Sequence, residues 1–222
     1  MKSPLSRPGL INSTVTAIIA IMLGASWVHG EVLLIDDFKD GIRPGWQVKK
    51  FEGLTAYTST VEEGIPCLKA TAEGTASGLF YEIEYDPRQK PILTWKWKID
   101  NIVKSGDART KKGDDYAARI YVLFPSFFFW KTKAINYVWA NRLPKGAAIA
   151  SSYTANAMVV AVESGPAETG KWLEYRRDIY EDYRKYFHST PGKVGAIAIM
   201  TDTDTTGEKA SACYGPIGIN SR

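Results

Sequence analysis

The sequence predicts an all-β protein: a single-domain antiparallel β-sandwich, jelly-roll-like, with one short helix near residues 179–187. Short runs rich in β-branched and aromatic residues recur along the chain, and Gly, Pro, Asp and Asn separate them. A convincing helix-start pattern occurs once. Many short strands with a single helix are typical of sandwiches and jelly rolls.

The predicted strands follow from these runs. In chain order they cover residues 32–35, 66–71, 78–85, 94–100, 115–124, 135–141, 158–163, 172–176, 194–201 and 212–219. The fourth alternates strictly, so Trp95, Trp97 and Ile99 are expected to face the interior. The fifth alternates too, which places Tyr116 and Ile120 on an apolar face.

The helix is predicted from its capping signals. Asp178 is a good N-cap, and Glu181 three residues later completes a pattern like a capping box. Glu181 and Lys185 form an i,i+4 pair in the favourable order. Pro191-Gly192 ends the helix.

The first thirty residues predict export. Lys2 and Arg7 precede an apolar stretch over residues 15–28, and Val28-His29-Gly30 offers small residues before Glu31. This is the pattern of a secretory signal peptide, and the stretch is short for a membrane span. The alternative is an uncleaved N-terminal anchor. We expect a signal peptide at 1–30 and one periplasmic or secreted domain at 31–222.

Charge and histidine content exclude several function classes. The full chain has a net charge of +4, which falls to about +2 without Lys2 and Arg7. That balance argues against nucleic-acid binding. His188 is the only histidine after residue 30, so a zinc site built on several histidines is excluded. Its place near the end of the predicted helix indicates a helix-terminal or surface residue.

Two cysteines, Cys67 and Cys213, leave two alternatives open. In an oxidising compartment they can form a disulfide, and otherwise they are buried thiols that pack as small apolar side chains.

A polar cluster in the fifth strand is the first candidate site. Asp115, Ala117, Arg119 and Tyr121 are expected on one face of that strand, with Asp114 beside them. An arginine in an alternating strand is unusual because buried charge is costly unless it is paired. The cluster predicts either a polar groove that binds a sugar or carboxylate, or a structural ion pair.

Lys96 and Lys98 share the polar face of the fourth strand. If that face adjoins Arg119, an anionic glycan is favoured. The full predicted ligand-binding set is Asp115, Arg119, Tyr121, Lys96, Lys98, Asn136 and Trp139.

A weak metal site is predicted at Asp202-Thr203-Asp204-Thr205-Thr206-Gly207. The segment begins like a calcium loop, but Cys213 stands where an EF-hand needs a glutamate. An oxygen-ligated calcium site at Asp202 and Asp204 therefore needs ligands from elsewhere. The alternative is an Asx-rich turn.

Aromatic density is the third candidate. Six tryptophans follow residue 30: Trp46, Trp95, Trp97, Trp130, Trp139 and Trp172. Aromatic rings bind sugars by covering their apolar faces. Phe127-Phe128-Phe129-Trp130 is expected as core; as a loop it would dock on a membrane surface or a protein partner.

Four segments together resemble one family. They are Thr94-Trp95-Lys96-Trp97, Gly113-Asp114-Asp115-Tyr116-Ala117-Ala118-Arg119, Asn136-Tyr137-Val138-Trp139-Ala140 and Met200-Thr201-Asp202-Thr203-Asp204-Thr205-Thr206-Gly207. The chain resembles the bacterial exported proteins of domain-of-unknown-function family 3047 from Asp37 to Ile219. One departure is Thr205, where the family pattern has Asn. The resemblance implies export and a one-domain extent, and it implies no activity.

The leading functional hypothesis is an exported, non-catalytic binding module of the cell envelope for carbohydrate or another polar polymer. The alternatives are a glycan-cleaving enzyme that pairs Asp114 or Asp115 with Asp202 or Asp204, and a structural partner protein.

Overall fold

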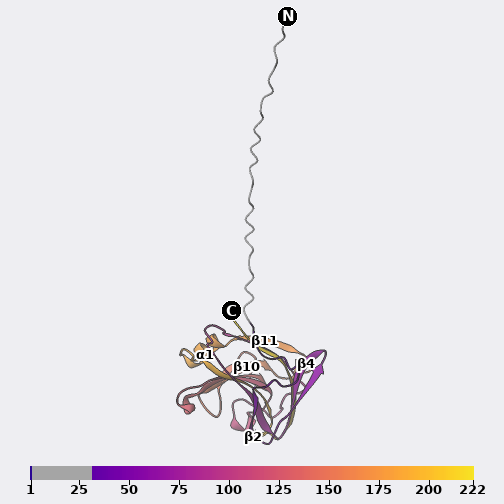
Figure 1. Ribbon diagram of the computed structural model, residues 1–222. Helices are drawn as coiled ribbons and strands as arrows, with labels where there is room; N and C mark the ends of the chain where they lie inside the picture. The colour runs from indigo at the N-terminus through magenta and orange to yellow at the C-terminus, as the bar shows by residue number, and fades with distance from the viewer. Residues whose placement is uncertain (2–31) are drawn as a thin grey trace.

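Two β-sheets pack face to face in the computed structural model, which describes Met1 and residues 32–222 (Figure 1). The predicted signal peptide lies outside the described residues. The first sheet has the order β11 (Leu173–Asp178), β6 (Ile92–Ile99), β13 (Lys209–Asn220), β4 (Ile65–Glu73) and β3 (Ala56–Glu62), and β1 (Leu33–Asp36) pairs with β13. The second sheet has the order β2 (Trp46–Glu52), β5 (Ala76–Tyr85), β12 (Val194–Asp202), β7 (Tyr116–Phe124), β8 (Lys133–Ala140), β10 (Ala157–Ser164) and β9 (Ala148–Ala150).

The predicted β-sandwich is confirmed, with one exception to its antiparallel pairing. β8 and β10 run parallel, with Val138 opposite Ala161, and the other strand pairs of the described chain are antiparallel. β9 lies between them in sequence and pairs with the far side of β10. Each predicted strand overlaps an observed one, whereas β2, β3 and β9 were not predicted.

The aromatic residues mainly form the core between the sheets. Trp95, Trp97 and Trp139 are at most 1% exposed. Trp95 stacks on Tyr137 and on Tyr175, with ring centroids 5.4 and 5.3 Å apart. The strict alternation of β6 therefore predicted its buried face correctly, because side chains of a strand point alternately to its two faces.

Helix α1 (Ile179–Phe187) begins and ends as predicted. The Asp178 carboxylate accepts a hydrogen bond from the Glu181 backbone N–H at 3.0 Å. His188 terminates the helix in the left-handed conformation, with φ 49°, and its side chain is exposed. Figure 1 places α1 and β11 near the C-terminus, and Arg222 forms an ion pair with Asp178 at 2.9 Å.

Short helical turns flank β7. Lys111–Gly113 form a 3-10 turn ahead of it, and Phe129–Lys131 form another after it. The expectation that Phe127-Phe128-Phe129-Trp130 is core is wrong, because these side chains lie in the β7–β8 loop and are 96%, 43%, 80% and 59% exposed. The segment sits beyond the end of β7, where the opposite sheet does not cover it.

Cys67 and Cys213 are buried free thiols on the neighbouring strands β4 and β13. The sequence left a disulfide and two buried thiols open as alternatives, and the structure has the two thiols without a disulfide bond.

A second apolar cluster covers part of the outer face of the second sheet. Tyr116, Val138, Val159 and Ala161 project from β7, β8 and β10, and Leu143 packs on them from the loop after β8. The loops therefore cover one half of this outer face. The other half, over β2, β5, β12 and β7, holds the candidate site.

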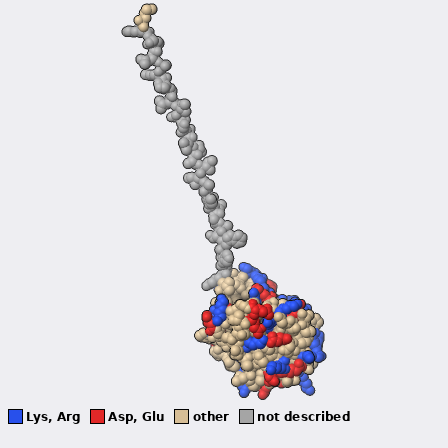
Figure 2. All heavy atoms as spheres, turned by 90° about the vertical axis from the view of Figure 1, so that its right-hand side faces the viewer, with Lys and Arg blue, Asp and Glu red and all other residues tan. Residues whose placement is uncertain are grey.

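Within residues 32–222, no helix has the length and apolar composition that a bilayer crossing requires. On the face turned to the viewer in Figure 2, basic and acidic side chains are interspersed. This mixture agrees with the small net charge of the sequence.

Candidate binding pocket

An open pocket of about 370 Å³ lies on the outer face of the seven-stranded sheet. Arg119, Tyr121, Met200 and Asp202 line it from β7 and β12. The other lining residues are Phe51 on the edge strand β2, Ala76 at the start of β5, and Asp114, Tyr153, Asp204 and Thr205 in loops.

Strand register places Arg119 in this pocket. Arg119 lies opposite Val138 on one neighbouring strand and opposite Met200 on the other. Directly opposed residues of an antiparallel pair point to the same face. Val138 belongs to the cluster on the outer face, so Arg119 and Met200 point outward as well.

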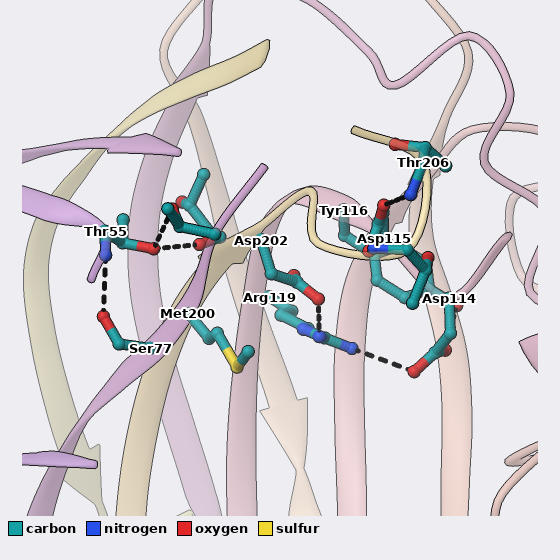
Figure 3. A network of polar contacts seen from close by, with 12 residues as sticks. Thr55, Ser77, Asp114, Asp115, Tyr116, Arg119, Met200, Asp202 and Thr206 are labelled. Atoms are coloured by element: carbon teal, nitrogen blue, oxygen red, sulfur yellow. Dashed lines mark hydrogen bonds and ion pairs between the residues drawn. The ribbon is translucent and has the colours of Figure 1, made fainter. Parts of the chain in front are cut away.

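Arg119 is a buried cation held between two carboxylates. Its guanidinium forms an ion pair with Asp202 and a second one with Asp114 at 3.4 Å (Figure 3). The residue is 4% exposed, and the rings of Tyr116 and Tyr121 lie 5.0 and 5.6 Å from its guanidinium carbon. Burial alone would lower its pKa, but Asp202 and Asp114 hold the pKa of Arg119 well above its ordinary value.

Asp115 does not pair with Arg119. Its carboxylate accepts a hydrogen bond from the backbone N–H of Thr206 at 2.7 Å (Figure 3) and another from that of Thr205 at 3.3 Å. Its backbone carbonyl accepts a hydrogen bond from Asn141 Nδ2 at 2.7 Å. Asp115 is fully buried and holds the loop that follows Asp202, the last residue of β12, and that contains Asp204.

A bulge explains why the shared face of Asp115 and Arg119 was predicted wrongly. Met200 lies opposite Arg119, but Asp202 lies opposite Tyr116, so β7 contains one extra residue in this interval. An extra residue reverses the alternation of side chains beyond it. Tyr116 accordingly packs on the outer face with Arg119 and not in the core between the sheets.

The carboxylates outnumber the cation at this site. Burial raises the pKa of Asp202 well above its ordinary value, and Asp115, Asp114 and Asp204 add to the rise, although Arg119 opposes it. Desolvation and the nearby Asp115 carboxylate also raise the pKa of Asp204, which is exposed. Burial is therefore the main cause of both rises, and the neighbouring carboxylates add to it.

The predicted metal residues meet a third carboxylate. Asp115, Asp202 and Asp204 offer oxygen atoms that all lie within 4.8 Å of one another. Asp202 Oδ1 is buried without a hydrogen-bond partner, while its other oxygen binds Arg119. Oxygen ligands suit Ca²⁺, but a calcium ion here would share Asp202 with the guanidinium.

The pocket is also lined by two exposed aromatic side chains, which the sequence patterns did not identify as candidate binding residues. Phe51 at the end of β2 is 59% exposed, and Tyr153 in the β9–β10 loop is 55% exposed. Tyr153 donates a hydrogen bond to the Lys111 carbonyl at 3.3 Å, and Lys111 Nζ lies 5.4 Å from the centre of its ring. Neither residue belongs to an alternating run, and only the tertiary structure brings them to one site.

Three predicted binding residues lie elsewhere. Lys96 and Lys98 project from β6 in the other sheet, where Lys96 pairs with Glu174 at 3.1 Å and Lys98 pairs with Glu62 at 2.6 Å. Their face does not adjoin Arg119, which removes the argument for an anionic glycan. Trp139 is buried in the core, and its indole N–H donates to the Gly165 carbonyl at 2.9 Å.

Asn136 does lie on the outer face, directly opposite Tyr121. It is 4% exposed, it does not line the pocket, and its Oδ1 atom has no hydrogen-bond partner. Of the predicted ligand-binding residues, Arg119 and Tyr121 line the pocket. Asp115 does not line it but binds the backbone of the loop that contains Asp204.

The fold and the site define a β-sandwich with an open, acidic pocket on the outer face of one sheet. The chain belongs to the DUF3047 family, described as a protein of unknown function, whose model matches residues 44–218. The predicted membership of this family is thereby confirmed over residues 44–218.

Solved structures with a similar outline share little sequence with this chain. A variant of CBM29-2, a family 29 carbohydrate-binding module, is 10% identical, with a TM-score of 0.42 over 87% of each chain. The carbohydrate recognition domain of Emp47p is 10% identical, with a TM-score of 0.46 over 85% of this chain and 94% of that one. The xyloglucanase domain of NopAA from Sinorhizobium fredii is 8% identical, with a TM-score of 0.44 over 81% of this chain and 95% of that one. Likenesses at this level assign no ligand to the chain. No curated protein matches the sequence.

Proposed function

We propose that this protein is an exported, non-catalytic binding module of the cell envelope, and that its pocket binds a neutral carbohydrate. The observation that carries the proposal is the pocket itself, in which exposed aromatic rings stand beside carboxylates and a buried arginine. Its volume is near the small end of the range for ligand pockets, about 300–1,000 Å³, and suits a short oligosaccharide or a chain end.

The aromatic residues supply the apolar contact. Phe51 and Tyr153 are more than half exposed, so each has a ring surface free to cover the C–H face of a sugar. Phe51 comes from the edge strand β2 and Tyr153 from the β9–β10 loop. Rings from two separate segments can contact a sugar from more than one side.

The carboxylates select for neutral ligands. Asp114 and Asp204 line the pocket and can accept hydrogen bonds from sugar hydroxyl groups. Asp114, Asp115, Asp202 and Asp204 are gathered around a single guanidinium, so the carboxyl groups outnumber the cation. A uronic acid would meet like charge there, which costs binding free energy.

Calorimetry with oligosaccharides identified on a glycan array tests this proposal. The array carries neutral and uronic-acid oligosaccharides, and we expect binding to the neutral ones. Tyr153→Ala and Phe51→Ala should each weaken binding at least tenfold, because each removes a large aromatic ring that would cover the apolar face of the sugar; a base stacked on such a ring contributes on the order of 1–3 kcal/mol. Both residues are exposed, so the thermal melt should change little.

Val61→Ala is the matched control. Val61 is 62% exposed on β3, an edge strand of the other sheet, and it does not line the pocket. This variant should bind like the wild type. Equal binding by Tyr153→Ala, Phe51→Ala and Val61→Ala, or exclusive binding of uronic-acid oligosaccharides, would contradict the proposal.

A glycan-cleaving enzyme is the second candidate, and one observation favours it. Asp204, with a raised pKa, lines the same pocket as Asp114, which is paired with Arg119. Glycoside hydrolysis uses two carboxyl groups in one site, and these two line the same pocket. Asp115 is unsuited to this role because both its oxygens bind backbone N–H groups.

A reducing-end assay on every bound oligosaccharide separates the two candidates. We expect no release of reducing ends by the wild type. Turnover that disappears in Asp204→Asn while oligosaccharide binding persists would establish the enzyme instead.

A further inference from the structure

The β7–β8 loop carries an exposed aromatic cluster that the pocket does not use. Phe127, Phe128, Phe129 and Trp130 are consecutive, and their side chains pack on one another with ring centroids 5.1 Å apart. Phe127 and Phe129 are 96% and 80% exposed. At 150–250 Å² per aromatic side chain, the cluster exposes on the order of 500 Å², comparable to the largest apolar patch of a typical monomer.

We propose that this aromatic loop docks the protein on an anionic lipid surface. Aromatic side chains have a preferred place at the boundary between headgroups and acyl chains, where an apolar ring can be buried beside polar groups. A loop tip with four adjacent rings can insert to that depth while the sheets remain outside.

The charge next to the loop selects the lipid. Lys131 Nζ lies 5.2 Å from the centre of the Phe128 ring, and Lys133 Nζ lies 4.7 Å from that of Phe187. Among the described residues, neither lysine forms an ion pair with a carboxylate, and residues 125–133 contain no Asp or Glu. Two basic groups beside an apolar tip match a surface of anionic headgroups.

The size of the cluster argues against a second copy of the chain as the occupant. A stable protein interface buries about 800 Å² on each partner, which is more than this cluster exposes. A lipid surface needs no complementary shape, so a projecting tip suffices.

The loop is held in place from below. Asn156 Nδ2 donates a hydrogen bond to the Trp130 carbonyl at 2.8 Å, and Lys133 Nζ donates one to Ser189 Oγ at 3.2 Å. Asn156 lies in the same β9–β10 loop as Tyr153, a pocket residue. Docking through this loop would therefore hold the pocket close to the lipid surface.

Vesicle flotation with the full chain tests the proposal. The vesicles are phosphatidylcholine alone or phosphatidylcholine with about one third phosphatidylglycerol. We expect Phe127→Ser/Phe129→Ser to lower the affinity for the anionic vesicles at least tenfold, and high salt to weaken wild-type binding. Leu54→Ser/Val61→Ser is the matched control, because those side chains are 63% and 62% exposed outside the loop.

A second measurement, the quenching of tryptophan fluorescence, reports insertion of the loop separately from any vesicle binding through residues 15–28. Lipids brominated on their acyl chains should quench part of the wild-type tryptophan fluorescence, and Trp130→Phe should lose that part. Equal flotation of the two double variants, or identical quenching with and without Trp130, overturns the proposal. Self-association that Phe127→Ser/Phe129→Ser abolishes, without vesicle binding, would assign the cluster to a protein interface instead.

Discussion

Arg119 is both a pocket residue and a structural one. Its removal would leave the buried Asp202 carboxylate without its ion pair, beside the carboxylate of Asp115. We expect Arg119→Ala to destabilise the fold by about 3–5 kcal/mol, as measured by urea unfolding, because a buried charge without its partner is costly. Loss of binding in this variant alone would therefore not identify a ligand contact.

The double variant Arg119→Met/Asp202→Asn removes both charges and should recover much of that loss. A single Arg119→Ala variant that unfolds at the wild-type urea concentration would contradict the structural role of this ion pair.

Asp204 should make stability depend on pH. Its folded-state pKa is raised above 3.8, so its stabilising contribution is complete below that pH and is lost as pH rises through the raised value. Asp204→Asn removes this loss. We expect the variant to melt above the wild type at neutral pH, by an amount equivalent to at most about 1 kcal/mol, and the difference to vanish below pH 3.8.

The measured quantity is the difference in melting between the wild type and Asp204→Asn, so the titration of groups that both proteins contain largely cancels. Glu62 acts in the opposite direction, because Lys98 and Lys69 outweigh its burial and lower its pKa to about 2; its contribution is lost as pH falls toward that value. A wild-type advantage at neutral pH would show that Asp204 is not repelled by its neighbours.

Calcium binding is a separate prediction for the Asp115, Asp202 and Asp204 carboxylates. An ion that binds only the folded state raises the melting temperature as its concentration increases. We expect millimolar calcium to raise the melting temperature of the wild type and to have less effect on Asp204→Asn. A melting temperature that is the same in calcium and in chelator would reject the site.

At the scale of elements, a buried carboxylate attaches α1 to both sheets. Asp182 accepts hydrogen bonds from the Tyr137 hydroxyl at 2.7 Å and from Arg177 Nε at 2.9 Å. We expect Asp182→Ala to cost about 3 kcal/mol, because it leaves Arg177 and Tyr137 without their acceptor. The N-cap variant Asp178→Ala should cost about 1 kcal/mol.

Both variants are measured by urea unfolding, with Arg184→Ala on the exposed side of the helix as the control. Equal destabilisation by Asp182→Ala and Asp178→Ala would mean that the network with β8 and β11 contributes little.

The strands that sequence patterns missed share a physical reason. β2 and β3 are edge strands whose residues are exposed or half-buried throughout, with the patterns WQVKKFE and AYTSTVE. An edge strand with little buried surface has no need of regular apolar alternation, so its sequence carries a weak signal. Phe51, a pocket residue, lies on one of them.

For the whole molecule, we predict that the mature protein begins at or near Glu31. Lys2, Arg7 and the apolar residues 15–28 motivate this expectation, and these positions lie outside the described residues. Mass spectrometry of the protein isolated from its native host decides it. An intact chain that retains Met1 would contradict cleavage and favour an uncleaved anchor.

Local patterns along the chain were enough to predict the β-sandwich class, the bounds of α1, the buried face of β6 and the family. These features depend on periodicity and capping, which act over a few neighbouring residues. The sequence also identified Arg119 as a charge that needs a partner.

The partners of Arg119 and the position of the pocket depend instead on contacts between segments that are far apart in the sequence. The bulge in β7 turned Asp115 away from Arg119, and strand order placed Lys96 and Lys98 on the opposite sheet. Tyr153 and Phe51 come to Arg119 from distant segments. Register, bulges and strand order arise from long-range pairing, and a linear pattern of residues does not encode which strands become neighbours.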